Sequence, residues 1–163
     1  MTGSTHMAGG ATAVMVYAAV SQANLSPITL LAAGAIGIVG GLFPDIDHPS
    51  SKISQKLPWL SRMISSFCGH RGLIHSPLLY LFLWLGWIWL APAPYQFWGN
   101  MFLLGAASHL LLDMLNSKGI PVFAPLSKKR IHLARIKLGG VFETSIQLTL
   151  ILTAASLLLR QCF

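Results

Sequence analysis

Acidic side chains are scarce in this sequence. Its 163 residues include only four Asp and Glu against 11 Lys and Arg, and charged residues make up 9% of the chain. A soluble domain carries about 25% charged residues, so an ordinary water-facing surface is excluded. The hydrophobic fraction of 54% and the mean hydropathy of +0.65 indicate an integral membrane protein. The length fits a single membrane-embedded domain over residues 1–163.

Cysteine is also rare. Cys68 and Cys162 lie far apart and form no paired motif. Their spacing excludes a disulfide framework and a CxxC zinc knuckle. A metal site in this chain would therefore depend mainly on histidine and carboxylate ligands.

Five apolar segments divide the chain, at residues 7–20, 27–43, 77–91, 99–115 and 142–159. Most have about 14–18 residues, somewhat fewer than the roughly 20 that cross a bilayer as a helix, so we expect their ends to extend into flanking residues. Glycines at 34, 37, 40 and 41 in the second segment favour close packing against a neighbouring helix. The fold class predicted is all-α and polytopic, with about five transmembrane or membrane-embedded helices.

Residues 52–67 are expected to form an additional, amphipathic helix. Apolar residues recur there at spacings of three and four, and the basic residues occupy other positions of the helical wheel. Pro58 is expected to interrupt or kink this helix. The pattern is typical of a helix that lies in the membrane interface.

The positive charge predicts an orientation. With five spans, the N-terminus, residues 44–76 and residues 116–141 share one side of the membrane, and ten of the eleven Lys and Arg residues lie there. The positive-inside rule places that side in the cytoplasm. We expect the basic segment 128–137 to contact anionic membrane lipids, and nucleic acid is the less favoured partner.

The few acidic residues lie beside histidines, and the same topology places them on the predicted cytoplasmic side. His109 and Asp113 are one helical turn apart, so both side chains point to one side of a helix, as the paired ligands of HExxH helices do. The candidate metal ligands are His6, Asp45, Asp47, His48, His70, His75, His109, Asp113 and Glu143. Imidazole and carboxylate suit Zn²⁺, Mn²⁺ or Fe²⁺. The set exceeds one tetrahedral site, so two or three ions are expected.

Several of these residues also have a purely structural interpretation. A lone buried histidine usually belongs to a packed core, but a charge near His109 inside a membrane segment indicates function. Asp45 could cap a helix. Glu143, near a helix start, could interact with the helix dipole, serve as a ligand or act as a base. Arg71, placed between two candidate ligands, is interpreted as an anion clamp for phosphate, with a surface lipid contact as the alternative.

These motifs resemble the YdjM-like family of membrane-bound, metal-dependent hydrolases of bacteria, which is associated with LexA regulation. The resemblance runs from His6 to about Glu143. Its carriers are His6, the Pro44-Asp45-Ile46-Asp47-His48-Pro49 box, the His70-Arg71-Gly72-x-x-His75-Ser76 box, the His109-x-x-x-Asp113 helix and Gly139-Gly140-x-x-Glu143. The family is distantly similar to zinc-dependent phospholipases C, which implies a multinuclear zinc site. Ile74 and Asn116 stand where the family commonly has Thr, so each position loses a hydroxyl near the site.

The expected function is hydrolysis of a phosphoester, with a phospholipid or another membrane-associated molecule as substrate, in the bacterial inner membrane. A metal ion would activate water, Asp45 or Glu143 would accept a proton, and Arg71 would hold the phosphate. The alternative is a non-catalytic scaffold or sensor that a metal stabilises. A metal transporter is less favoured, because the polar residues gather at one end of the helices. The sequence does not indicate an oligomeric state.

Overall fold

A computed structural model describes residues 1–48, 51–68, 72–127 and 129–162. Long helices occupy most of this part of the chain: α1 (Gly3–Val20), α2 (Pro27–Leu42), α5 (Pro77–Leu90), α6 (Ala93–Met114) and α7 (Val141–Cys162). Shorter helices are η1 (Phe43–Asp47), α3 (Lys52–Lys56), α4 (Pro58–Cys68) and η2 (Leu73–His75). Within the described ranges, β-pairing is limited to isolated bridges between residues 116 and 136 and between 120 and 131. The all-α prediction is confirmed.

Each of the five apolar segments corresponds to one long helix. Among the described residues, Pro27–Asp47 and Val141–Gln161 are long and apolar enough to cross a membrane, and Pro77–Leu90 is apolar but shorter. The structure therefore supports two candidate spans and a shorter third helix. A topology with five spans stays a prediction.

Prolines set the starts of several helices. Pro27, Pro58 and Pro77 each occupy the first residue of their helix, where the missing N–H leaves no hydrogen bond unmade. Ser26 caps α2 by accepting a hydrogen bond from the backbone N–H of Thr29 at 3.1 Å. The amphipathic helix expected at residues 52–67 is divided into α3 and α4 immediately before Pro58, as a proline in that position predicts.

Glycines bring the backbones of α1, α2 and α6 into direct contact. A Cβ atom built on Gly105 of α6 would lie 2.9 Å from the carbonyl carbon of Gly37 and 3.0 Å from the nitrogen of Gly41. A Cβ on Gly37 would lie 2.7 Å from the carbonyl oxygen of Gly10 in α1. Only residues without a side chain allow this approach. The contact fixes the three helices relative to one another.

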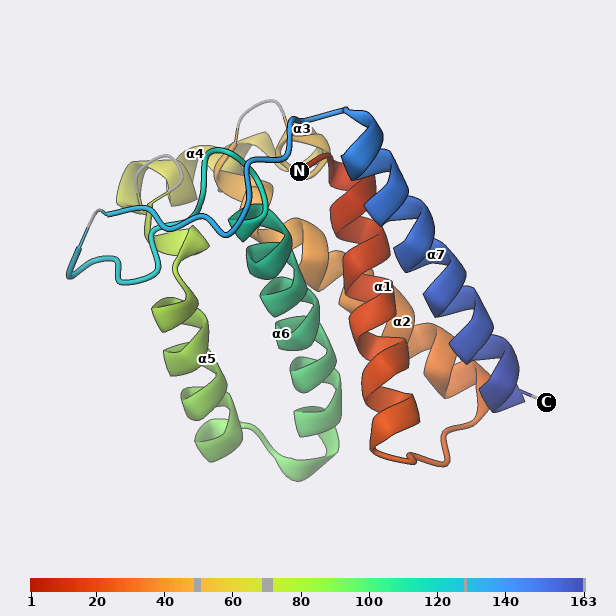
Figure 1. The fold of residues 1–163 in the computed structure, drawn as a ribbon. Coiled ribbons are helices and arrows are strands. Elements are labelled where there is room, and N and C mark those ends of the chain that lie inside the picture. Colours follow the sequence, from red (N-terminus) through yellow and green to blue (C-terminus); the bar gives the residue numbers. More distant parts are fainter. Residues whose placement is uncertain (49–50, 69–71, 128, 163) are drawn as a thin grey trace.

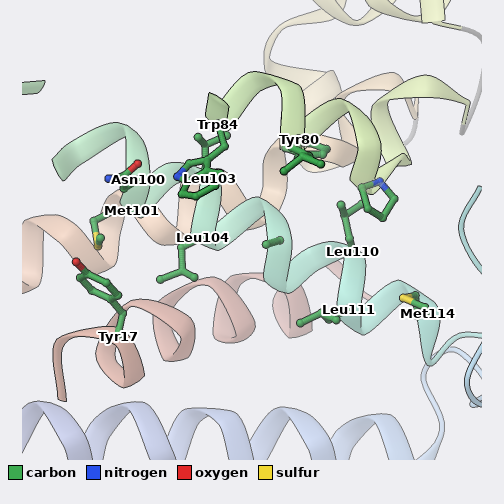
Figure 2. Close-up of a pocket in the computed structure, with 13 residues that line it drawn as sticks. Tyr17, Tyr80, Trp84, Asn100, Met101, Leu103, Leu104, Leu110, Leu111 and Met114 are labelled. Carbon is green, nitrogen blue, oxygen red and sulfur yellow. The ribbon is translucent and has the colours of Figure 1, made fainter. Parts of the chain in front are cut away.

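The remaining long helices flank this group (Figure 1): α7 lies along α1, and α5 stands beside α6 at the edge of the fold. An apolar cleft of about 670 Å³ lies along α5 and α6, where Tyr80 and Trp84 approach Leu103 and Leu110 (Figure 2). The N-terminus, α3, α4 and the α6–α7 connection lie at one end of the fold. The α1–α2 and α5–α6 connections lie at the opposite end.

Candidate metal centre

Six of the predicted site residues come together where α1, α2 and α6 meet at one end of the fold. They are His6 near the start of α1, Asp45 and Asp47 in η1, His75 at the end of η2, and His109 and Asp113 in the last turns of α6. Their side chains are at most 5% exposed, except that of Asp45, which is 16% exposed. We call these six residues the His–Asp cluster.

His109 is oriented by the backbone of α2. Its Nδ1–H donates a hydrogen bond to the carbonyl oxygen of Gly41 at 2.7 Å. The other ring nitrogen, Nε2, then faces Asp113 Oδ2 at 3.7 Å and Asp45 Oδ1 at 3.9 Å. A hydrogen bond from one nitrogen to a carbonyl is how proteins fix the tautomer and direction of a metal-binding histidine.

His75 faces carboxylates on both sides of its ring. Nδ1 lies 3.7 Å from Asp47 Oδ2, and Nε2 lies 3.8 Å from Asp45 Oδ1 and 3.9 Å from Asp113 Oδ2. The next residue, Ser76, donates hydrogen bonds from its hydroxyl to the carbonyls of residues 122 and 124 at 3.2 and 2.9 Å. The α6–α7 connection therefore anchors the turn that carries His75.

His6 completes the cluster from α1. Its ring stacks on that of His109, with ring centroids 3.7 Å apart and an interplanar angle of 17°. His6 Nε2 lies 3.3 Å from Asp113 Oδ1, which also accepts a hydrogen bond from the amino group of Met1 at 2.5 Å. Three imidazoles and three carboxylates thus share one small volume.

The donor atoms fit a divalent metal ion. Both ring nitrogens of His6 and His75, and Nε2 of His109, are buried without a hydrogen-bond partner among the described residues. Buried polar atoms rarely stay unpaired, and most nitrogen–oxygen separations in the cluster are too long for a direct hydrogen bond. Two ligands bound tetrahedrally to one zinc at 2.0–2.1 Å lie about 3.3 Å apart. The observed 3.3–3.9 Å separations are close to that value.

The cluster contains two overlapping candidate metal groups. His6, Asp45 and His109 form one, and His75, His109 and Asp113 form the other, with the donor atoms of each group within 4.8 Å of one another. Both groups include His109, whose second nitrogen is already bonded to Gly41. His109 therefore serves one ion at a time. A second ion would need bridging carboxylates, so the number of ions stays a prediction.

Glu143 lies apart from both candidate metal groups. Its Oε1 accepts hydrogen bonds from the Thr2 N–H at 2.5 Å and the Thr5 hydroxyl at 3.0 Å. Its Oε2 accepts one from the Gly139 N–H at 2.7 Å. The predicted role of Glu143 as ligand or base stays a prediction.

The remaining residues singled out in the sequence are not members of the His–Asp cluster. His70 and Arg71 lie outside the described residues, so their proposed roles as ligand and phosphate clamp are not placed. His48 is half-buried at the end of η1 and belongs to neither metal group. Ile74 is a buried apolar residue, and the amide oxygen of Asn116 accepts a hydrogen bond from the Ser117 hydroxyl at 3.3 Å.

Sequence reasoning missed two contacts that shape the cluster. The Gly41 carbonyl orients His109, yet a backbone oxygen leaves no signal in a sequence. The Thr5 hydroxyl donates a hydrogen bond to Glu143. The only sign of this contact in the sequence is that Thr5 directly precedes the candidate ligand His6.

The sequence is similar to known bacterial membrane proteins. The chain matches the family described as YdjM inner membrane protein over residues 1–162. A Bacillus subtilis protein named "Uncharacterized protein YvsG" is 37% identical over 163 residues, which cover all of this chain and 93% of the relative. The inner membrane protein YdjM of Escherichia coli is 41% identical over 91 residues, 52% of this chain and 44% of the relative. No solved structure matches significantly. These comparisons do not confirm the similarity to zinc-dependent phospholipases C.

Proposed function

The chain belongs to the YdjM inner membrane protein family, and we propose that it is a membrane-bound, metal-dependent hydrolase of a phosphoester. The observation that carries this proposal is the exposure of Asp45. Its side chain is 16% exposed, whereas the other members of the His–Asp cluster are at most 5% exposed. A metal site with one open side is typical of catalytic centres, whereas structural sites are closed by protein ligands.

The proposed chemistry assigns a role to each part of the cluster. His6, His75, His109 and Asp113 would hold one or more divalent ions, most simply Zn²⁺, with Mn²⁺ or Fe²⁺ as alternatives. Such an ion supplies Lewis-acid polarisation of a phosphoryl oxygen and makes water more acidic. Asp45, at the open side, would accept the proton of the attacking water.

Two further side chains, Asp47 and Arg71, have supporting roles in this proposal. Asp47 Oδ2 lies 3.7 Å from His75 Nδ1, so Asp47 would influence His75 through its charge, whereas the Gly41 carbonyl orients His109 through a hydrogen bond. Holding the phosphate is proposed for Arg71, on the basis of the sequence pattern alone.

The surroundings of the cluster favour a substrate that the bilayer presents. The α6–α7 connection lies at the cluster end of the fold (Figure 1) and exposes basic side chains beside Leu126 and Leu133, which are 83% and 68% exposed. Exposed apolar residues among basic ones suit the interface of an anionic membrane. We therefore propose a multi-pass inner membrane protein whose cluster faces the cytoplasm and whose substrate is a lipid or another membrane-associated phosphoester.

A basic contact with lipid makes a testable prediction. Replacing Lys129, Arg130, Arg135 and Lys137 with Gln should weaken retention of phosphatidylglycerol at least about tenfold relative to phosphatidylcholine, since each basic residue contributes about 1 kcal/mol near an anionic surface. Native mass spectrometry of the detergent-solubilised chain with each added lipid measures this. Arg160→Gln, in the last turn of α7, is the matched control and should change nothing. Equal retention by all three proteins would contradict a basic lipid-binding surface.

Asp45 provides the direct test of catalysis. We expect Asp45→Asn to lower phospholipid hydrolysis in mixed micelles at least about 100-fold, because a general base contributes 10²–10⁴-fold. The group formed by His75, His109 and Asp113 should still retain metal. Turnover and elemental mass spectrometry on the same preparation separate the two effects. If metal-replete wild-type protein hydrolyses no phosphodiester or phosphomonoester, the hydrolase proposal is wrong.

A non-catalytic role is the second candidate, and one specific observation favours it. The side chains of His6 and His109 are 0% exposed, as in a closed structural site. A metal bound there would join α1 and α6 and add its binding free energy to folding. This candidate predicts stoichiometric metal and a metal-dependent melting temperature without turnover.

A further inference from the structure

Glu143 is a buried carboxylate that joins the start of α7 to the start of α1. It lies in the first turn of α7, and its side chain accepts hydrogen bonds from Thr2, directly before α1, from Thr5 in the first turn of α1, and from Gly139 before α7. Its exposed fraction is 2%. Hydrogen bonds to an ionised acceptor are roughly twice as strong as those between neutral groups. This side chain is therefore a strong attachment between α7 and the first turn of α1.

The attachment point on α1 is next to a member of the His–Asp cluster. Thr5 precedes His6, whose ring stacks on His109 and whose Nε2 lies 3.3 Å from Asp113 Oδ1. His6 is the only contribution of α1 to either candidate metal group within the described residues. A small rotation or shift of the first turn of α1 would separate His6 from the cluster while leaving the ligands of α6 and η2 in place.

We propose that Glu143 is a positioning residue for His6: it holds the first turn of α1 so that the His6 imidazole faces Asp45 and His109. This inference rests on the metal centre proposed above. Glu143 is then not a ligand, because its two oxygens accept three protein hydrogen bonds and belong to neither candidate metal group.

A double-variant cycle tests whether Glu143 acts through His6. The proteins are the full-length, detergent-purified wild type, Glu143→Ala, His6→Ala and the combined variant, titrated with Co²⁺ and followed by its visible absorption spectrum. Glu143→Ala should weaken Co²⁺ binding at least about tenfold, the lower end of the 10–100-fold that losing an orienting partner costs. The combined variant should bind Co²⁺ as His6→Ala does, within about twofold, because the affected ligand is already absent.

Thr12 supplies a matched control. Its hydroxyl donates to the carbonyl of Leu150 in α7 at 2.8 Å and to that of Ala8 at 2.8 Å. It lies seven residues beyond Thr5, about 10 Å further along α1. Thr12→Val removes a bond between the same two helices away from the cluster, and it should leave the Co²⁺ titration unchanged. Glu143→Gln keeps an acceptor for Thr2 and Thr5, and it should restore most of the affinity if the alanine variant folds poorly.

A measurement without metal completes the test. In the metal-free protein, Glu143→Ala should raise amide hydrogen exchange in residues 3–10 at least about tenfold over wild type, because a charge-assisted anchor is lost, and Thr12→Val should not. A further tenfold loss of Co²⁺ affinity on adding Glu143→Ala to His6→Ala, or wild-type binding and exchange in Glu143→Ala, would overturn the positioning role. Absence of Co²⁺ binding by the wild type would instead overturn the metal centre itself.

Discussion

His109→Ala is expected to abolish stoichiometric metal binding. Both candidate metal groups include this residue, and its Nε2 is directed into the His–Asp cluster by the hydrogen bond to the Gly41 carbonyl. The loss of affinity should exceed the roughly 10–100-fold that follows when a ligand merely loses its orienting partner. Elemental mass spectrometry of protein purified without chelator, followed by competition with a metal indicator, measures it.

His132 is the matched control for that experiment. It is an exposed histidine in the α6–α7 connection, where its Nε2 accepts a hydrogen bond from Arg135 Nε at 3.3 Å. His132→Ala removes the same chemical group from the chain and should leave the metal content unchanged. Equal metal content in wild type, His109→Ala and His132→Ala, or no metal in any of them, would remove the basis of the proposed centre.

Gly105→Ala is expected to destabilise the fold by about 3 kcal/mol, the upper part of the usual range for overpacking. The new Cβ would collide with the backbone of α2 at Gly37 and Gly41. This collision can be relieved only if α2 or α6 moves. Because α6 also carries His109 and Asp113, the shift should lower metal affinity as well. Thermal unfolding in detergent, with and without metal, measures both effects.

Gly86→Ala makes the expected contrast. Gly86 lies in α5, and a Cβ built there has no atom within 4 Å. Alanine favours a helix over glycine by up to about 1 kcal/mol, so this variant should be as stable as wild type or slightly more so. The two substitutions are chemically identical, and opposite effects would isolate the contact between α2 and α6. If Gly105→Ala were harmless, the close approach of these helices would be wrong.

Much of the fold could be predicted from the sequence because its signals are local. The apolar segments predicted the long helices, and Pro58 predicted the break between α3 and α4. The glycines of the second segment predicted a close helix contact, and the structure confirms one at Gly37 and Gly41. Each of these features depends on residues that are neighbours along the chain or along one helix face.

The candidate site was only partly predictable. The one-turn spacing of His109 and Asp113 predicts that they share a helix face, and the structure places them so. The hydrogen bonds that Glu143 accepts were not predictable, because a sequence shows an acidic residue but not its donors. The exposure of Asp45 and the burial of its neighbours were likewise invisible, since burial depends on segments distant in the chain.

The sequence by itself determined a helical chain poor in charge, with several helix starts set by proline and with its few acidic residues and most of its histidines at or near the ends of the apolar segments. Tertiary structure alone decided which of those polar residues meet. Backbone contact between α1, α2 and α6 brings His6, Asp45 and His109 within reach of one ion, while α7 turns Glu143 towards α1. The physical reason is that helix formation depends on neighbouring residues, whereas a metal centre depends on side chains from distant segments held within a few ångströms.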